Sequence, residues 1–256
     1  MITETHTTTA DSASTSKTVI ERLFDVGAHF GFTKSRRHPT ASQFIFGNKQ
    51  GTDIIDLEQT VRLLEEAKEM CTESGKNGKT ILFVGTKEEI SGIVKTHAEL
   101  AKMPFVVNRW VGGMLTNFSE IKKRIARLHE LTAQGESGEL ERKYTKKERV
   151  VIGRELAKLT HNFSGIQNME RLPSALIIVD PRHDSIAVEE ARFLKIPIIA
   201  IASSDTNLRL VDYPVVANDA LQGSVSFILD ELVGAYKTGV SAFVPATPAR
   251  REEVRR

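Results

Sequence analysis

ALIIV at residues 175–179 and IPIIAIA at residues 196–202 are the stretches that decide the fold. Both are continuous apolar runs rich in β-branched residues, and neither alternates with polar residues. Runs of this kind are typical of strands that are covered on both faces. ILFV at 81–84, FVV at 105–107 and YPVV at 213–216 have the same character. The sequence therefore predicts about five buried strands.

Amphipathic segments separate these runs, at about 56–72, 87–101, 184–195 and 219–237. Alternating strands and helices indicate an α/β fold in which right-handed crossovers join parallel strands. We therefore expect a doubly wound parallel sheet with helices on both faces.

An interval of about 67 residues between FVV and ALIIV contains no strand signal. Within it, apolar residues recur at steps of three and four in two narrow seams, which are Phe118, Ile121, Ile125 and Leu128, and Ile152, Leu156, Leu159, Phe163 and Ile166. Gly135 and Gly138, in the polar stretch 132–143, predict a turn between them. The sequence thus predicts an inserted antiparallel helical hairpin, a coiled coil, at 115–166. The alternative is that both helices lie on the sheet like the others.

The α/β domain should then comprise residues 18–114 and 167–238. We expect a disordered tail at 1–17, which is rich in Thr and Ser, and a flexible tail at 239–256.

NRWVGGMLTNF at 108–118 is the stretch most suited to contact a polyanion. Arg109 can bind two phosphate oxygens, and the two glycines, Gly112 and Gly113, let the backbone approach a ligand. Thr116 or Asn117 can cap the helix that follows. Trp110 has two interpretations, a stacking platform for a base or a packed core residue, and we favour packing because a compact loop could be anchored by it.

Charge is distributed unevenly although the net charge is only +2. Residues 122–158 contain eleven Lys or Arg against six Glu, and residues 31–51 contain four Lys or Arg and no acid. Residues 53–73 and 180–231 each carry a net charge of −5. This pattern favours basic contact faces on an acidic remainder, although such runs are commonly just solvated faces.

Composition excludes several classes of protein. The single cysteine, Cys71, excludes an intrachain disulfide and a thiolate zinc cluster. No apolar run approaches the roughly 20 residues that a membrane-spanning helix needs, and residues 1–17 lack the features of a secretory or organellar signal. These observations predict a cytoplasmic protein.

Six further motifs accompany NRWVGGMLTNF in a fixed order: VGAHFG at 26–31, FIFG at 44–47, GTDIIDL at 51–57, ILFVGTK at 81–87, RLPSALIIVDPR at 171–182 and LVDYP at 210–214. From about Val19 to about Thr238, the chain closely resembles the S2 family of bacterial small-subunit ribosomal proteins. It departs from the family after HFG. The family usually has a His and then Trp-Asn-Pro-Lys-Met, where this chain has Phe32 and Arg37-His38-Pro39-Thr40-Ala41.

The resemblance implies a flavodoxin-like sandwich with a projecting coiled coil, and a non-enzymatic, ribosome-bound component of translation. It implies contacts with rRNA of the head and the body of the small subunit, late assembly, and a docking role for the large mRNA-capturing ribosomal protein S1. No cofactor, metal, membrane or homo-oligomer is expected. The RNA-binding residues that we predict are Lys34, Arg36, Arg37, Lys49, Asn108, Arg109, Trp110, Gly112, Gly113, Thr116, Asn117, Lys122, Lys123, Arg124 and Arg127.

Two other functions are compatible with parts of the pattern. Loops after three strands, at 85–87, 180–182 and 203–205, contain Gly, Lys and Asp residues that could hold a phosphate or a magnesium ion near Asp180 and Asp205, as in a nucleotide-binding enzyme. The chain lacks GxxxxGK[ST], GxGxxG, HExxH and a nucleophile elbow, so the enzyme interpretation is weak. His29 reads as a hydrogen-bonded structural histidine or a backbone contact, and not as a catalytic base. A coiled-coil adaptor that contacts only proteins is the third possibility.

Overall fold

The computed structural model describes residues 18–242. Its larger sheet is parallel, with the strand order β5-β4-β6-β7-β8. Counted along the chain from β4, this order is 2-1-3-4-5, the order of flavodoxin-like folds. The α/β class and all five predicted strands are confirmed, with these bounds: β4 (Ile81–Val84), β5 (Phe105–Val106), β6 (Ala175–Val179), β7 (Ile198–Ala202) and β8 (Tyr213–Val216).

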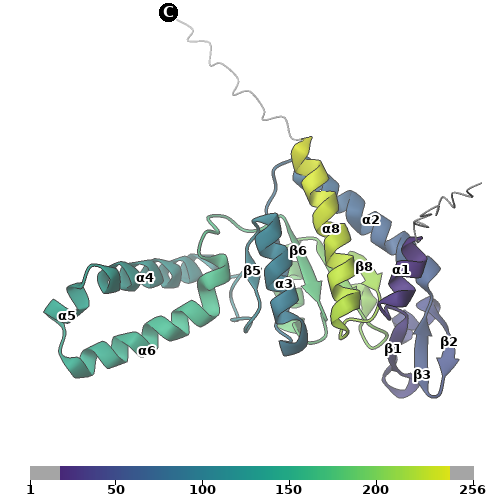
Figure 1. Cartoon of the computed structure of the whole chain (residues 1–256), viewed down its shortest axis with the longest axis horizontal. Coiled ribbons are helices and arrows are strands. Elements are labelled where there is room, and N and C mark those ends of the chain that lie inside the picture. Colours follow the sequence, from purple (N-terminus) through teal and green to yellow (C-terminus); the bar gives the residue numbers. More distant parts are fainter. Residues whose placement is uncertain (1–17, 243–256) are drawn as a thin grey trace, which may run out of the picture.

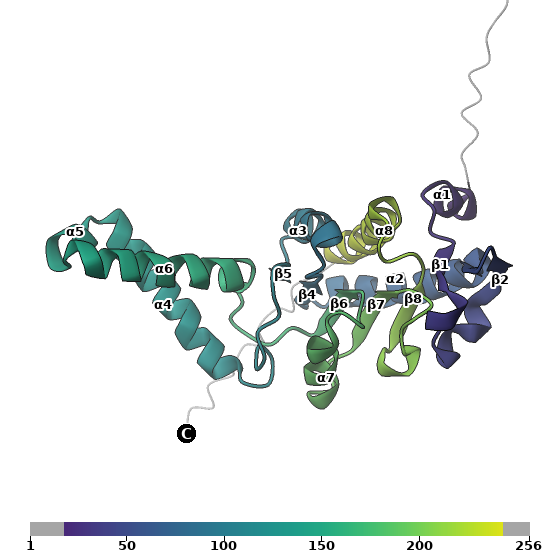
Figure 2. The ribbon, with the colours of Figure 1, turned by 90° about the horizontal axis from the view of Figure 1, so that it is seen from below.

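Helices cover both faces of this sheet, because successive side chains of each strand point to opposite sides. Ile81 and Phe83 of β4 pack in one core with α3 (Glu88–Ala101) and α8 (Gln222–Ser241). Leu82 and Val84 pack in a second core with α7 (Ser185–Phe193). Figure 2 shows α3 and α8 on one side of the strands and α7 on the other. The sheet is therefore doubly wound, as expected.

Helix α2 (Leu57–Lys76) lies along α8 at unusually close range, as Figure 1 shows. A Cβ atom on Gly239 would lie 2.1 Å from the carbonyl oxygen of Thr72, and one on Gly75 would lie 2.4 Å from that of Tyr236. Only glycine permits this approach of two helix backbones. Helix α8 ends at Ser241, so the flexible tail predicted from residue 239 is wrong at its start. Residues 1–17 and the rest of that tail lie outside the described residues.

A second sheet, antiparallel and in the order β1-β3-β2, was not predicted. Residues Gln50 and Gly51, both with positive φ (52° and 84°), make the two-residue turn between β2 and β3. The elements of this region are α1 (Val19–Asp25), β1 (Phe30–Thr33), η1 (Lys34–Arg36), η2 (Pro39–Phe44), β2 (Ile45–Lys49) and β3 (Thr52–Ile55). A short helical turn, η4 (Leu208–Leu210), lies between β7 and β8 in the chain and packs on η2.

Helices α4 (Phe118–Glu136) and α6 (Lys146–Phe163) run beside each other away from the sheet, and α5 (Glu139–Lys143) joins them at the far end (Figure 1). We call these three helices the hairpin. The ion pair of Arg127 with Glu155 fixes the antiparallel alignment of α4 and α6. The predicted turn is only partly right, since α4 continues through Gly135 and only Gly138, with a φ of 69°, adopts a turn conformation.

The interior of the hairpin is continuous with the second core of the sheet. Ile121, Ile125 and Leu128 of α4 pack with residues of α6 and, through η3 (Ser164–Ile166), with the strands. A helical hairpin is therefore present, while its supercoiling and its independence as a domain stay predictions. None of the helices between residues 18 and 242 combines the length and the apolar character that a membrane crossing requires.

Candidate nucleic-acid interface

The backbone of the loop at 110–116 surrounds a carboxylate that belongs to the protein itself, that of Glu190 on α7. Glu190 Oε1 accepts hydrogen bonds from Trp110 Nε1 (3.0 Å) and from the Gly113 N–H (2.8 Å). Glu190 Oε2 accepts from the Leu115 N–H, the Thr116 N–H and the Thr116 hydroxyl, each at 3.0 Å. The donors of this loop thus bind a carboxylate of the protein, that of Glu190.

Five donors keep the Glu190 carboxylate charged although only 8% of the residue is exposed. Burial alone would raise its pKa, but the hydrogen bonds from Thr116, Trp110, Leu115 and Gly113 outweigh burial, and the pKa is lowered. Glu190 therefore ties α7 to the loop that begins the hairpin.

Several loop residues predicted to contact RNA are consequently engaged within the protein. Gly113 and Thr116 use their donors on Glu190. Trp110 is only 7% exposed, so the packing interpretation holds and its ring is not open to a base. Asn117 occupies the N-cap position of α4 but makes no side-chain capping bond. Asn108 donates to the carbonyl oxygen of His161 on α6 at 2.5 Å.

Arg109 and Gly112 remain on the surface of this loop. Both are exposed, and a Cβ atom on Gly112 would meet no heavy atom within 4 Å. The structure therefore leaves one guanidinium and an open stretch of backbone at the start of the hairpin.

The four predicted cations of α4 divide into two pairs. Lys123 lies 2.6 Å from Glu120, and Arg127 pairs with Glu130 (2.9 Å) and Glu155 (3.4 Å). Lys122 and Arg124 are exposed and form no ion pair within residues 18–242. Lys122 lies over the ring of Phe118, with 5.2 Å from its Nζ to the ring centre. Ion pairs between exposed side chains, such as those of Lys123 and Arg127, are weak, but they reduce the free charge that is available to a phosphate.

The second group of predicted RNA-binding residues lies at the small sheet, and its two arginines form ion pairs within the protein. Arg37 holds both carboxylate oxygens of Asp53, which is fully buried. The hydrogen bond from Arg37, reinforced by one from Asn48, lowers the pKa of Asp53 against the effect of burial. Arg36 lies 4.3 Å from the ring of Phe32 and 3.3 Å from Asp205, which attaches this region to the loop after β7.

Lys34 and Lys49 are the members of this group that stay exposed without an ion pair in the described part of the chain. Figure 1 shows the small sheet at one end of the molecule and the hairpin at the other. The structure therefore does not bring the fifteen predicted residues together. It gathers them in two groups at opposite ends.

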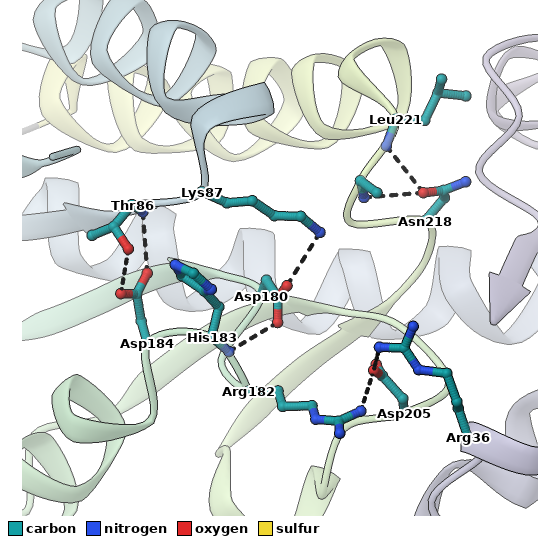
Figure 3. A network of polar contacts seen from close by, with 11 residues as sticks. Arg36, Thr86, Lys87, Asp180, Arg182, His183, Asp184, Asp205, Asn218 and Leu221 are labelled. Carbon is teal, nitrogen blue, oxygen red and sulfur yellow. Dashed lines mark hydrogen bonds and ion pairs between the residues drawn. The ribbon is translucent and has the colours of Figure 1, made fainter. Parts of the chain in front are cut away.

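The carboxyl ends of β4, β6 and β7, where doubly wound folds commonly bind ligands, carry a network of internal pairs (Figure 3). Lys87 Nζ lies 3.3 Å from Asp180, and Arg182 lies 2.6 Å from Asp205. Thr86 donates to Asp184 through its N–H (3.1 Å) and its hydroxyl (2.7 Å). Cations of the chain thus occupy both carboxylates that were considered for magnesium. Between residues 18 and 242, no three His, Cys, Asp or Glu side chains are grouped to hold a metal ion.

Asp219 and His29 have side-chain atoms without a hydrogen-bond partner. Asp219 is fully buried, neither of its carboxylate oxygens accepts a hydrogen bond, and burial raises its pKa to about 7. His29 packs between Phe24 (4.4 Å between ring centres) and Phe30 (4.0 Å), and its Nδ1 has no partner. Burial lowers the pKa of His29. It is structural as predicted, but through aromatic packing and not through a side-chain hydrogen bond.

Comparison with known proteins decides among the three possible functions. The family described as ribosomal protein S2 matches residues 23–239. The chain belongs to the ribosomal protein S2 family.

Curated relatives in this family are similar to the chain over most of their lengths. The small ribosomal subunit protein uS2 of Nocardia farcinica is 42% identical over 223 residues, which are 87% of this chain and 78% of the relative. The uS2 protein of Fusobacterium nucleatum is 38% identical over 233 residues, 91% and 94% of the two chains. That of Thermus thermophilus is 42% identical over 214 residues, 84% and 83%.

Membership of the ribosomal protein S2 family makes this chain a structural ribosomal protein of the small subunit and not an enzyme. The polar network at the strand ends is accordingly a set of structural pairs that join the loops after β4, β6 and β7. Glu190 was not among the residues predicted from the sequence, because nothing near it in the chain marks its partners. A carboxylate in the apolar helix SIAVEEARF was the only available signal.

Proposed function

We propose that the chain holds rRNA of the small ribosomal subunit through its two basic ends, without reading base sequence. The observation that carries this proposal is that five of the predicted RNA-binding cations are exposed and have no ion pair within residues 18–242. Arg109, Lys122 and Arg124 lie at the hairpin, and Lys34 and Lys49 lie at the small sheet. Lysine and arginine side chains neutralise phosphates and release counterions, which supplies affinity that is independent of sequence.

The elongated shape supports contacts with two separate rRNA elements. The two groups of free cations lie at opposite ends of the molecule (Figures 1 and 2). The body between them includes helix α2, whose exposed face carries Glu65, Glu66 and Glu69. We infer that each end binds its own RNA segment. This arrangement fits the expectation that the protein joins rRNA of the head to rRNA of the body, with the coiled-coil hairpin as the longer arm.

The salt dependence of binding tests the phosphate contacts. Arg109→Gln with Lys122→Gln should lower the magnitude of the slope of log affinity against log salt concentration by about 0.7–0.9 for each phosphate that is no longer neutralised. The matched control is Arg62→Gln with Lys76→Gln, which removes the same charge from α2, where both residues are exposed. Equal slopes for both double variants would refute the placement of rRNA on the hairpin.

We also propose a docking surface for ribosomal protein S1 at α1. Large apolar side chains are exposed there, namely Ile20 (41%), Phe24 (59%), Phe30 (47%) and Leu221 (44%). Phe30 and Leu221 approach each other across Gly27, so these residues form one patch. Contiguous exposed apolar surface of this kind is typical of protein interaction sites.

Binding of purified S1 to variants of the chain tests this surface. Phe24→Ser should reduce capture of S1, while Phe193→Ser on α7, which removes an even more exposed phenylalanine (78%), should not. Equal capture by both variants would place S1 elsewhere.

A further inference from the structure

The base of the hairpin contains a cavity of about 630 Å³. We call it the hairpin-base pocket. It lies between Gly112, Ile121 and Arg124 on the side of the loop and α4, and Lys158, Leu159 and Phe163 on the side of α6. Its volume is within the range of roughly 300–1,000 Å³ of pockets that hold small ligands.

The apolar part of the pocket is fixed in place by the second core. Ile121, Leu159 and Phe163 are 6%, 7% and 5% exposed, so little of each side chain remains free to move away from the cavity. This part is a rigid apolar floor, in which most of each side chain is already covered and Phe163 is the aromatic member.

The charged part of the pocket is positive after internal pairing. The two acids on its wall, Glu120 and Glu155, are paired with Lys123 (2.6 Å) and Arg127 (3.4 Å). Arg124 and Lys158 form no ion pair within residues 18–242. Asn162 also lines the cavity, and its amide makes no hydrogen bond within residues 18–242. Two cations and a free amide therefore surround an apolar floor.

We infer that the hairpin-base pocket binds one unpaired nucleotide of rRNA, with its base on the apolar floor and its neighbouring phosphates on Arg124 and Lys158. The inference rests on the proposed function, since it assumes that rRNA lies on the hairpin. A paired base is held inside its duplex, but unpaired bases of loops and bulges can be extruded and stacked on protein side chains. Asn162 supplies a donor and an acceptor to the edge of the base. The hairpin would thus recognise a position in the RNA and not only its backbone.

Gly112 provides a way to fill the pocket without disturbing the fold. A Cβ atom at Gly112 would have no neighbour within 4 Å, and its φ is not positive, so a side chain is tolerated there. Gly112→Leu therefore places an apolar side chain at the pocket. Gly153→Leu on α6 is the matched control, since Gly153 is equally open but does not line the pocket.

The experiment measures binding of the full chain to purified small-subunit rRNA, together with acylation of the RNA 2′-hydroxyl groups. We expect Gly112→Leu to bind roughly 5-fold to 150-fold more weakly, which corresponds to the loss of one stacked base. The slope of log affinity against log salt concentration should be the same for Gly112→Leu and for the wild type, because the substitution changes no charge. One nucleotide that the wild type and Gly153→Leu protect should become reactive. Arg124→Gln with Lys158→Gln should instead lower the magnitude of the slope, by about 0.7–0.9 for each phosphate released.

The outcomes separate this inference from the proposed function. Steep salt-dependent binding by the wild type, with equal affinity and equal protection in Gly112→Leu, would overturn the pocket and keep the phosphate contacts. Absence of salt-dependent binding by the wild type would overturn both. Unchanged RNA binding together with failure of a neighbouring protein to join the subunit would mean that a protein segment occupies the pocket, which also overturns the inference.

Discussion

Glu190→Gln is the substitution whose effect follows most directly from the structure. Glutamine has the same shape, but one of its two terminal atoms is an NH₂ group that cannot accept a hydrogen bond. If the nitrogen replaces Oε1, Trp110 Nε1 and the Gly113 N–H lose their acceptor. The three donors of Leu115 and Thr116 keep an oxygen, but a neutral one. The opposite orientation loses three bonds instead of two.

Hydrogen bonds to charged groups contribute about 1.5–3 kcal/mol each, so the loss of two predicts a decrease of about 3–6 kcal/mol in the free energy of unfolding. For a chain of this size, the melting temperature should fall by roughly 6–24 °C. Thermal melting followed by circular dichroism measures this. Glu189→Gln, at the adjacent exposed position, is the control and should melt like the wild type.

The effect should also depend on pH. Because the pKa of Glu190 is lowered in the folded protein, its stabilising contribution is present above the unfolded pKa of about 4.3 and is lost as the pH falls through the folded pKa. The difference between wild type and Glu190→Gln should therefore be widest near pH 7 and shrink in acid. A variant that melts with the wild type at pH 7, or a difference that does not change with pH, would refute this account of the loop.

Three further predictions concern stability and assembly. Burial raises the pKa of Asp219 to about 7 in the folded protein, against about 3.9 in the unfolded chain. Between these two pH values only the folded state holds the proton. The free energy of unfolding of the wild type should therefore fall by up to about 4 kcal/mol as the pH rises across that interval. The advantage of Asp219→Asn over the wild type in urea unfolding should therefore grow between pH 5 and pH 8; an advantage that does not grow would contradict the burial of an unpaired carboxylate. Trp110→Ala should cost about 3–5 kcal/mol of stability, and an unchanged melting temperature would show that the indole is not a core residue. Replacing residues 129–153 with a short Gly/Ser linker cuts α4 and α6 at the same level, given the pairing of Arg127 with Glu155, and should leave a cooperatively melting protein that still binds rRNA through the hairpin base. Loss of folding would show that the outer hairpin is needed by the α/β domain.

The parallel sheet could be predicted because strands buried on both faces must be apolar throughout, and ALIIV at 175–179 is buried at every position. The small sheet could not be predicted in the same way. Its strands are short and only partly buried, as in β2 (Ile45–Lys49), so they show no long apolar run. Gly51, between two short runs of apolar residues, was a weak clue, because Gln-Gly is not one of the dipeptides that mark a two-residue hairpin turn.

The candidate site was predictable in its chemistry but not in its partners. The residue types at 108–118 predicted contact with a polyanion, which stays a prediction, whereas the carboxylate that the loop surrounds comes from Glu190, more than seventy positions away in the sequence. Pairs at short helical spacing, such as Glu120 with Lys123, could have been read from the sequence. The pairing of Arg37 with Asp53 depends on how the small sheet folds, so only the structure reveals it.

Directed cleavage of rRNA from single cysteines tests the two-ended placement most directly. The native Cys71 is buried and its pKa is raised to about 12, so a thiol-specific reagent that carries an iron chelate should modify only an introduced cysteine. We predict that Lys122→Cys at the hairpin and Lys49→Cys at the small sheet, each assembled into small subunits, cleave two separate segments of the small-subunit rRNA, while Glu69→Cys on α2 gives little cleavage. Cleavage of one common segment by both, or strong cleavage only from Glu69→Cys, would contradict the central claim that rRNA is held at the two basic ends.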